Sequence, residues 1–329
     1  MTGAIGRPAR TSDLPLLRMT DLRVAFGGVE AVRGLSLDIR AGQTLGVVGE
    51  SGCGKSVSWL GLLGLLGPEA RVGGSALLDG EELIGADIKT LTEVRGGRIA
   101  MVFQDPTGAL NPMRSVGWQI DEVLRIHRNM RGREVRRETC RLLERVGIPD
   151  PSRRADAYAH ELSGGQNQRV GIAIALAGQP NLLIADEPTT ALDPTVQAQI
   201  LDLLKDIQRE TGMAMVLISH DLSVVSEVCD EVAVMYAGEL VERCSARTLF
   251  RGPAHPYPQA LLAALPSLDG PKRKMQPIRG SVPQGDDMPQ GCLFAPRCDR
   301  LIAACSRRQP LREIAPGHFV RCNRAMARL

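Results

Sequence analysis

The sequence has 329 residues, 43% of them hydrophobic, and a formal net charge of +3 at pH 7. This apolar content is enough for a sizeable core, and the longest apolar stretch, residues 59–67, is far shorter than the roughly 20 residues that a membrane span needs. We therefore expect a soluble protein and exclude a chain dominated by low-complexity sequence. Residues 1–13 are polar and basic with no apolar stretch behind them, which predicts a disordered start and not a signal peptide.

A glycine-rich loop follows the first clear strand pattern. Residues 44–48 form a short apolar run typical of a buried strand, and residues 56–66 are apolar enough for a helix. Between them the chain reads G-E-S-G-C-G-K-S, which fits the phosphate-binding pattern G-x-x-x-x-G-K-[ST]. Backbone N–H groups of such a loop surround phosphates, while Lys55 reaches the β and γ phosphates and Ser56 binds magnesium. The predicted nucleotide-binding residues here are Gly49, Ser51, Gly52, Cys53, Gly54, Lys55, Ser56 and Val57.

Two acidic residues follow a second apolar run, at residues 182–185. Because ligands gather at the carboxyl ends of parallel strands, we expect Asp186 to hold magnesium and Glu187 to polarise the attacking water. Far more residues separate Lys55 from Asp186 than a simple strand–helix–strand crossover needs. Residues 116–130 and 133–146 carry apolar side chains at helical spacing, so we predict a helical insertion at about residues 105–165.

Residues 162–166 read Leu-Ser-Gly-Gly-Gln and precede a helical pattern at 170–176, which would place free N–H groups and a hydroxyl at a helix start. Together with the phosphate loop and the Asp-Glu pair, this pentapeptide resembles the signature of the ATP-binding cassette (ABC) ATPases. The resemblance implies an α/β P-loop fold with a parallel-sheet core, an antiparallel β subdomain and an inserted helical subdomain. It also implies that the signature closes on ATP held by a partner cassette, through Ser163, Gly164, Gly165 and Gln166. Asn167 departs from the pattern, since relatives usually carry a larger, often basic residue there.

The same resemblance assigns roles to four single residues, each of which would be unremarkable alone. Gln104, which follows the apolar residues 99–103, would sense magnesium and the attacking water, and His220, which closes the run 215–219, would contact the γ phosphate. Phe26 would stack on adenine, although a core phenylalanine is the alternative. Asp193 lies in the loop that communicates between two ATP sites. The implied catalytic set is Glu187, His220 and Gln104, and the implied magnesium ligands are Ser56, Gln104 and Asp186.

The chain changes character after residue 250. A His-Pro-Tyr-Pro sequence begins at His255, and residues 271–291 are rich in proline, glycine and charge, which predicts an irregular segment. Residues 251–329 contain 13 Lys and Arg against 5 Asp and Glu. This extension resembles the C-terminal domain of the ATP-binding subunits of oligopeptide and dipeptide importers, which share Gly-Cys-x-Phe-x-x-x-Cys, here at 291–298. We therefore divide the chain into a start at 1–13, a nucleotide-binding domain at 14–250 and a small irregular C-terminal domain at 251–329.

Four of the eight cysteines lie in the extension: Cys292, Cys298, Cys305 and Cys322. Disulfides are disfavoured because the chain carries no export signal. Zinc sites usually show paired C-x-x-C spacings, which are missing, whereas wide single spacings are compatible with a [4Fe–4S] cluster, and some relatives carry one. We favour the cluster over Zn²⁺ and over unmetallated thiols. His318, near Cys322, could replace one ligand, although a satisfied surface histidine is the simpler expectation.

The resemblance implies an ATPase that powers the import of di- or oligopeptides from the cytoplasmic face of the cell membrane. Its expected partners are a second, distinct ABC ATPase, two transmembrane permease subunits and an extracytoplasmic solute-binding protein. The alternatives are a nickel or opine importer, or a soluble ABC ATPase that acts on nucleic acid or ribosomes. Repair relatives usually carry a long coiled coil and translation relatives two cassettes. The sequence shows neither, so we expect no nucleic-acid partner.

Overall fold

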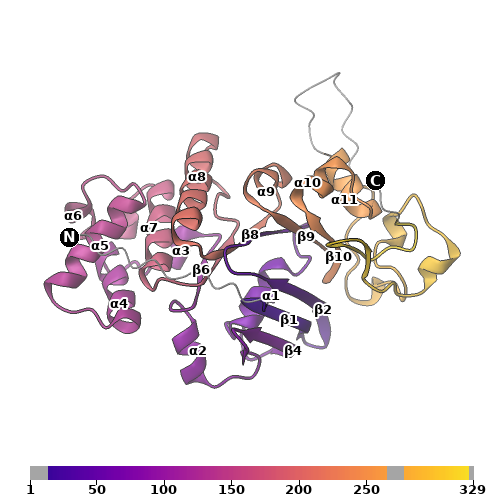
Figure 1. The fold of residues 1–329 in the computed structure, drawn as a ribbon, viewed down its shortest axis with the longest axis horizontal. Helices are drawn as coiled ribbons and strands as arrows, with labels where there is room; N and C mark the ends of the chain where they lie inside the picture. The colour runs from indigo at the N-terminus through magenta and orange to yellow at the C-terminus, as the bar shows by residue number, and fades with distance from the viewer. Residues whose placement is uncertain (1–13, 265–277, 326–329) are drawn as a thin grey trace.

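Two β-sheets form the framework of the protein. The computed structural model describes residues 14–264 and 278–325, so the predicted disordered start at 1–13 lies outside the described residues. One sheet has four strands in the order β2-β1-β4-β5, and the other has eight in the order β11-β12-β10-β9-β3-β8-β7-β6. In Figure 1 the smaller sheet lies below the larger one, helices α3–α7 lie at one end of the molecule, and the C-terminal segment lies at the other. The P-loop α/β architecture expected from the sequence is confirmed.

The smaller sheet is antiparallel and covers one face of the core. It comprises β1 (Leu17–Phe26), β2 (Val29–Ile39), β4 (Ala70–Leu78) and β5 (Glu81–Glu82). Buried and exposed residues alternate along the first part of β1, as expected for a strand with one solvated face. The buried face packs on α1 (Lys55–Leu62), whose Trp59 is fully buried. We predicted that this helix would continue to residue 66, but Gly64 has a φ of 60°, which ends it early.

The larger sheet is parallel from β6 to β9. Its strands are β3 (Thr44–Val48), β6 (Ile99–Val102), β7 (Leu182–Asp186), β8 (Ala214–Ser219), β9 (Glu231–Tyr236) and the antiparallel β10 (Glu239–Ser245). Every residue of β3, β7 and β8 is buried, because the sheet is covered on both faces. Side chains alternate between two cores: Ile184 faces the antiparallel sheet, and Leu183 faces the helices. All parallel strands therefore end at one edge, where the predicted site residues follow them.

The helical insertion lies between β6 and β7, after α2 (Ile88–Val94). Its elements are α3 (Pro106–Ala109), α4 (Val116–Arg128), α5 (Arg133–Arg145), α6 (Pro151–Arg154), a 3₁₀ turn (Ala159–Glu161) and α7 (Gly164–Ala177). The helices predicted at 116–130 and 133–146 are confirmed to within two residues at each end. The helix predicted at 170–176 begins earlier, at Gly164, because Ser163 caps it. No helix among the described residues is long and apolar enough to cross a membrane.

The chain after β8 ends in a segment that joins the larger sheet. Helices α9 (Leu222–Val228), α10 (Ala246–Arg251) and α11 (Pro256–Ala263) follow α8 (Pro194–Thr211), and 3₁₀ turns occupy Gly285–Asp287, Ala295–Arg297 and Ala303–Ser306. Two short strands, β11 (Arg312–Ala315) and β12 (His318–Val320), then pair with each other, and β12 pairs with β10. We expected an irregular segment here. Strands of three and four residues are too short for a readable alternation, so this continuation of the core sheet was not predicted.

Candidate functional site

The glycine-rich loop joins β3 to α1, and two of its glycines are required by close backbone contacts. A Cβ at Gly49 would lie 2.2 Å from the carbonyl oxygen of Met235, and one at Gly54 would lie 2.6 Å from that of Ala31. Gly54 also adopts a φ of 94° as it begins α1. The loop therefore lies directly against neighbouring strands and leads into the N-terminus of α1, where backbone N–H groups favour an anion.

The lysine and serine of the loop are both held by hydrogen bonds. Lys55 is buried, and its Nζ donates to the carbonyl oxygens of Gly49 at 2.8 Å and Glu50 at 3.1 Å. The Ser56 hydroxyl donates to Oδ1 of Asp186 at 2.9 Å, although 130 residues separate the two. Burial raises the pKa of Asp186, and the hydrogen bond from Ser56 opposes that shift. The structure thus brings together two of the three ligands predicted for magnesium, a cation that prefers oxygen ligands, while the third, Gln104, contacts Glu187.

The three predicted catalytic residues meet at a carboxylate oxygen of Glu187. Glu187 directly follows β7, and its Oε2 accepts hydrogen bonds from Gln104 Nε2 at 3.0 Å and from the Thr190 hydroxyl at 2.8 Å. Nδ1 of His220 lies 3.2 Å from the same oxygen. Gln104 and His220 come after β6 and β8, the strands on either side of β7, so the sheet itself gathers this group. Thr190 was not among the predicted residues; it lies three residues after Glu187, in a turn whose sequence gives no distinct signal.

The two other predicted nucleotide contacts lie at element ends. Phe26 is half-buried at the last position of β1 and packs against the core beneath the antiparallel sheet. Asp193 caps α8, where its Oδ1 accepts a hydrogen bond from the backbone N–H of Val196 at 3.0 Å. The structure does not bring either residue into hydrogen-bonded contact with the Glu187 group, so their predicted roles stay predictions.

The signature residues form a capped helix start. The Ser163 hydroxyl accepts a hydrogen bond from the N–H of Gln166 at 3.3 Å, and the Gln166 side chain accepts one from the N–H of Ser163 at 3.2 Å. Gly164 and Gly165 are the first two residues of α7, and a Cβ at Gly165 would lie 2.7 Å from Cγ1 of Val196. In Figure 1, α7 stands among the inserted helices while α1 lies on the antiparallel sheet. The signature is thus separate from its own chain's phosphate loop.

The departure at Asn167 has a structural reason. This side chain is buried, and its Nδ2 donates a hydrogen bond to the carbonyl oxygen of Ala159 at 2.9 Å. A long basic side chain would have to leave this interior position. Asn167 therefore fixes the start of α7 against the preceding 3₁₀ turn.

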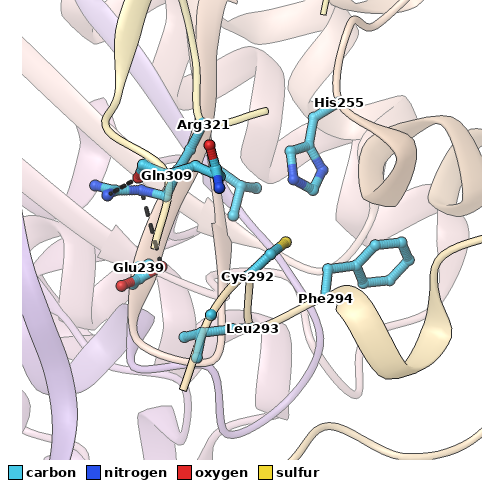
Figure 2. A pocket seen from close by; sticks show the side chains of 9 residues that line it. Glu239, His255, Cys292, Leu293, Phe294, Gln309 and Arg321 are labelled. Atoms are coloured by element: carbon cyan, nitrogen blue, oxygen red, sulfur yellow. Dashed lines mark hydrogen bonds and ion pairs between the residues drawn. The ribbon is translucent and has the colours of Figure 1, made fainter. Parts of the chain in front are cut away.

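The four cysteines of the extension line one pocket, which they share with His255 and Phe294. The N–H of Cys292 donates to the carbonyl oxygen of Cys305 at 2.9 Å, which ties the two segments together. Burial raises the pKa of Cys292 and of Cys298, and the neighbouring thiols add to the shift. All eight cysteines are free thiols in this structure. Figure 2 shows an adjoining pocket, in which the Cys292 side chain points toward the side where His255 and Phe294 lie.

His318 is not the surface histidine that we expected. It is buried, and its Nε2 lies 2.8 Å from Oε1 of Glu242, a residue with no exposed surface. Glu242 also accepts hydrogen bonds from the backbone N–H groups of Ala254, at 2.8 Å, and His255, at 2.7 Å. The expectation was wrong because β12 pairs with β10 and carries His318 into the interior. Its ring is engaged with Glu242, so the four cysteines remain the ligand candidates in the extension.

Comparison with known proteins agrees with this geometry. The family model described as ABC transporter matches residues 32–190, and the model described as oligopeptide/dipeptide transporter, C-terminal region, matches residues 241–305. The oligopeptide transport ATP-binding protein OppD of Escherichia coli (strain K12) is 48% identical over 93% of this chain and 92% of its own length. The dipeptide transport ATP-binding protein DppD of Bacillus subtilis (strain 168) is 46% identical over 93% and 94%.

Solved structures match the cassette part of the chain. A dimeric ATP-binding cassette bound to ADP and Pi, MJ0796, aligns with a TM-score of 0.63 and 29% identity over 70% of this chain and 99% of that one. The cbiO1 protein of Clostridium perfringens, part of an ABC transporter complex, aligns with a TM-score of 0.62 and 30% identity over 73% and 92%. The chain therefore belongs to the ABC transporter family of ATPases and carries, after its cassette, the C-terminal region of the oligopeptide and dipeptide transporters.

Proposed function

We propose that this protein is the ATP-hydrolysing subunit of a multi-subunit importer of di- and oligopeptides. The observation that carries the proposal is the group formed by Glu187, Gln104 and His220 at the carboxyl ends of three neighbouring strands, beside the Ser56–Asp186 pair. Relatives named for peptide import match over nearly the whole chain, including the extension. The cargo assignment rests on those relatives, and the chemistry rests on the geometry.

The mechanism follows from the contacts. The phosphates of ATP would draw Lys55 away from the carbonyl oxygens of Gly49 and Glu50, while Ser56 and Asp186 would hold magnesium. Glu187 would accept a proton from the attacking water, which Gln104 orients, and His220 would contact the γ phosphate. In a head-to-tail pair of cassettes, the free N–H groups at the start of α7 would complete the ATP site of the partner.

Replacing the proposed base tests the chemistry. Glu187→Gln keeps the shape of the side chain but cannot take a proton, so turnover of ATP should fall at least about 100-fold. ATP affinity should stay within about threefold, because the phosphate loop is untouched. Steady-state hydrolysis by the assembled complex and binding of a fluorescent ATP analogue measure the two quantities. Thr190→Val is the matched control: it removes one hydrogen bond to the same oxygen and should cost far less turnover. Near-normal hydrolysis by Glu187→Gln would refute the assignment.

We further propose that the subunit works at the cytoplasmic face of the membrane. Its partners would be a distinct second ABC ATPase, two transmembrane permease subunits and an extracytoplasmic solute-binding protein. The names of the relatives support an importer, and the helices α3–α7 offer a surface that projects from the core sheet (Figure 1). Purification of the native complex, with identification of its subunits and bound solute, tests this. Recovery of the chain with ribosomes or nucleic acid instead would contradict it.

We also propose a [4Fe–4S] cluster held by Cys292, Cys298, Cys305 and Cys322. Zinc bonds of about 2.3 Å hold tetrahedral thiolates roughly 3.8 Å apart. Within residues 14–264 and 278–325, the one group of three His, Cys, Asp or Glu ligand atoms that all lie within 4.8 Å of one another is Glu242, Cys244 and His318, which includes none of the four. The four cysteines, all among the described residues, line one pocket, and no three of their sulfurs lie within 4.8 Å of one another, which argues against a single zinc ion and favours the larger cluster. When bound, such a cluster supplies a one-electron redox centre.

Metal analysis distinguishes the iron–sulfur cluster from zinc. Protein purified without oxygen should be brown and contain about four iron atoms per chain, and Cys298→Ser should lower the iron content. Cys140→Ser, at a half-exposed cysteine of α5 outside the pocket, is the matched control and should leave the iron unchanged. Colourless protein with one zinc ion per chain would contradict the proposal.

A further inference from the structure

We propose that the C-terminal extension positions the phosphate loop through Glu50, so that nucleotide binding and the state of the cysteine pocket affect each other. Glu50 is the second residue of the glycine-rich loop, at a position that the phosphate-binding pattern leaves open. The inference rests on the proposed nucleotide site and assigns Arg297 and Tyr257 as positioning residues of that site.

The extension holds Glu50 at both its side chain and its backbone. The two guanidinium nitrogens of Arg297 lie 2.6 and 3.0 Å from the two carboxylate oxygens, which is the bidentate arrangement that makes such pairs strong. The backbone N–H of Glu50 donates to the hydroxyl of Tyr257 at 2.9 Å. Arg297 and Tyr257 are 247 and 207 residues away in the sequence. The phosphate loop is therefore fastened to the extension at one residue.

The surroundings make these contacts hard to release. The Arg297 side chain is only 3% exposed, and its Nε donates to the carbonyl oxygen of Arg279 at 2.8 Å. Its guanidinium also lies 5.8 Å from the centre of the Tyr236 ring. If Glu50 moved away, a buried cation would lose its only carboxylate partner among the described residues, which is costly. Tyr257 is fully buried, so the loop contact is sealed from water on that side too.

Arg297 belongs to the segment that carries two of the cysteines, Cys292 and Cys298. Arg297 ends the 3₁₀ turn Ala295–Arg297 and directly precedes Cys298. Phe294, between Cys292 and Cys298, packs its ring 5.2 Å from that of Tyr236 and 5.4 Å from that of Tyr257. A displacement of either cysteine, by loss of a ligand or by modification, would therefore shift the aromatic contacts and the guanidinium together.

Lys55 links Glu50 to the nucleotide site. Its Nζ donates to the carbonyl oxygen of Glu50, so the residue that Arg297 holds is also a partner of the lysine that must reach the phosphates. When nucleotide binds, Lys55 moves toward the phosphates and gives up its hydrogen bond to the carbonyl oxygen of Glu50. The position of Glu50 therefore affects how readily Lys55 reaches the nucleotide. Because a coupling between two sites is reciprocal, bound nucleotide should also change the cysteine pocket.

The first test measures nucleotide affinity in the full-length chain. Arg297→Lys keeps the charge but loses the bidentate contact, and it should weaken the binding of a fluorescent ADP analogue about 10-fold. In the assembled complex, KM for ATP should rise while kcat stays close to the wild-type value, because no group at the Glu187 carboxylate is altered. Arg308→Lys is the matched control, since its side chain is 45% exposed and pairs with Glu239 and not with the phosphate loop, and it should bind as the wild type does. Wild-type affinity in Arg297→Lys overturns the inference.

Two further variants separate coupling from misfolding. Tyr257→Phe keeps the buried ring and removes only the hydroxyl, so it should fold and weaken ADP binding about threefold. Adding Glu50→Gln to Arg297→Lys should cause little further loss of ADP affinity, since both changes break the same contact. Independent, additive losses from the two substitutions would contradict the inference.

The reciprocal test reads the cysteines. In the wild-type chain from which iron has been removed with a chelator, ADP should slow the labelling of Cys298 by iodoacetamide several-fold, followed by mass spectrometry. ADP should have no effect in Arg297→Lys treated in the same way. Equal labelling with and without ADP in the wild type would overturn the inference. Lys55→Ala distinguishes failure of the proposed coupling from failure of the proposed nucleotide site. If it abolishes ADP binding while Arg297→Lys binds normally, the coupling fails and the nucleotide site stands; if Lys55→Ala still binds ADP, the nucleotide site itself is wrong.

Discussion

The two ends of the eight-stranded sheet are attached to their neighbouring segments in different ways. At the β6–β7 end, the ion pair between the helical insertion and α8 is Arg145–Glu210, in which the carboxylate is 63% exposed. At the β10–β12 end, the extension is joined by strand pairing and by the buried contact between Glu242 and His318. Exposed pairs contribute little and exchange readily with water, whereas a buried charge cannot lose its partner cheaply. The comparison shows that a buried polar contact fastens the extension to the sheet, whereas the insertion has an exposed ion pair to α8 and packs on the sheet through the apolar side chains of α7.

The largest expected effect comes from breaking the buried contact of the extension. Glu242→Ala removes the acceptor for two backbone N–H groups and for His318, and it should lower the free energy of unfolding by about 3–5 kcal/mol. Urea unfolding followed by circular dichroism measures this. The matched control is Glu210→Ala, which breaks the ion pair with Arg145 whose carboxylate is 63% exposed and should cost under about 1 kcal/mol. Similar losses for both variants would remove the distinction between the two ends.

A smaller effect is expected inside the helical insertion, and it depends on pH. The guanidinium groups of Arg141 and Arg128 lower the pKa of Glu138 to about 2, from an ordinary value of 4.5. Because the folded-state pKa is depressed, the stabilisation is complete above pH 4.5 and is lost as the pH falls toward 2. Glu138→Gln should therefore destabilise the protein by about 2 kcal/mol at pH 7.

Unfolding curves of Glu138→Gln and the wild type at several pH values test this sign. Their difference should shrink below pH 4.5 and vanish near pH 2. Glu134→Gln, on the exposed side of the same helix, is the control and should change stability by under about 0.5 kcal/mol. A difference between Glu138→Gln and the wild type that stays constant with pH would show that the ion pairs do not hold the insertion together.

The smallest stability effect concerns the signature at the start of α7. Ser163→Ala removes the cap and should cost about 1 kcal/mol, while Ser163→Asn keeps a capping oxygen and should be close to neutral. Both variants lose the hydroxyl that we propose contacts a partner's nucleotide, so both should reduce ATP turnover in the complex. Thermal melts and hydrolysis assays separate the two roles. Equal stability of Ser163→Ala and the wild type would show that the cap contributes nothing.

Much of the cassette could be predicted because its information is local. The strand at 44–48 and the helices that begin at Val116 and Arg133 follow from apolar patterns within single segments, and the structure places them there. The residues that meet at Glu187 were predicted by resemblance, and they come together because they follow adjacent strands. The pattern of strand followed by polar residue places Gln104 and His220 at this edge of the sheet, and the resemblance was needed to select them.

The contacts of the extension could not be predicted, because they depend on pairs that are distant in the sequence. Nothing around Glu50 indicates that its partner is Arg297, and nothing around His318 indicates Glu242. Glu242 meets His318 because β12 pairs with β10, and Arg297 meets Glu50 because the neighbouring Phe294 packs against Tyr236. Apolar periodicity records which face of an element is buried, and it carries no information about the partner that buries it.

Strands β11 and β12 also protect the protein against association through its sheet edge. Without them, β10 would expose a row of unpaired backbone groups beside buried side chains such as Cys244. An open edge of this kind is a template on which another chain can add a strand. A version of the protein cut after residue 250 would expose this edge of β10. The extension therefore covers the edge of the core sheet with two strands of only four and three residues.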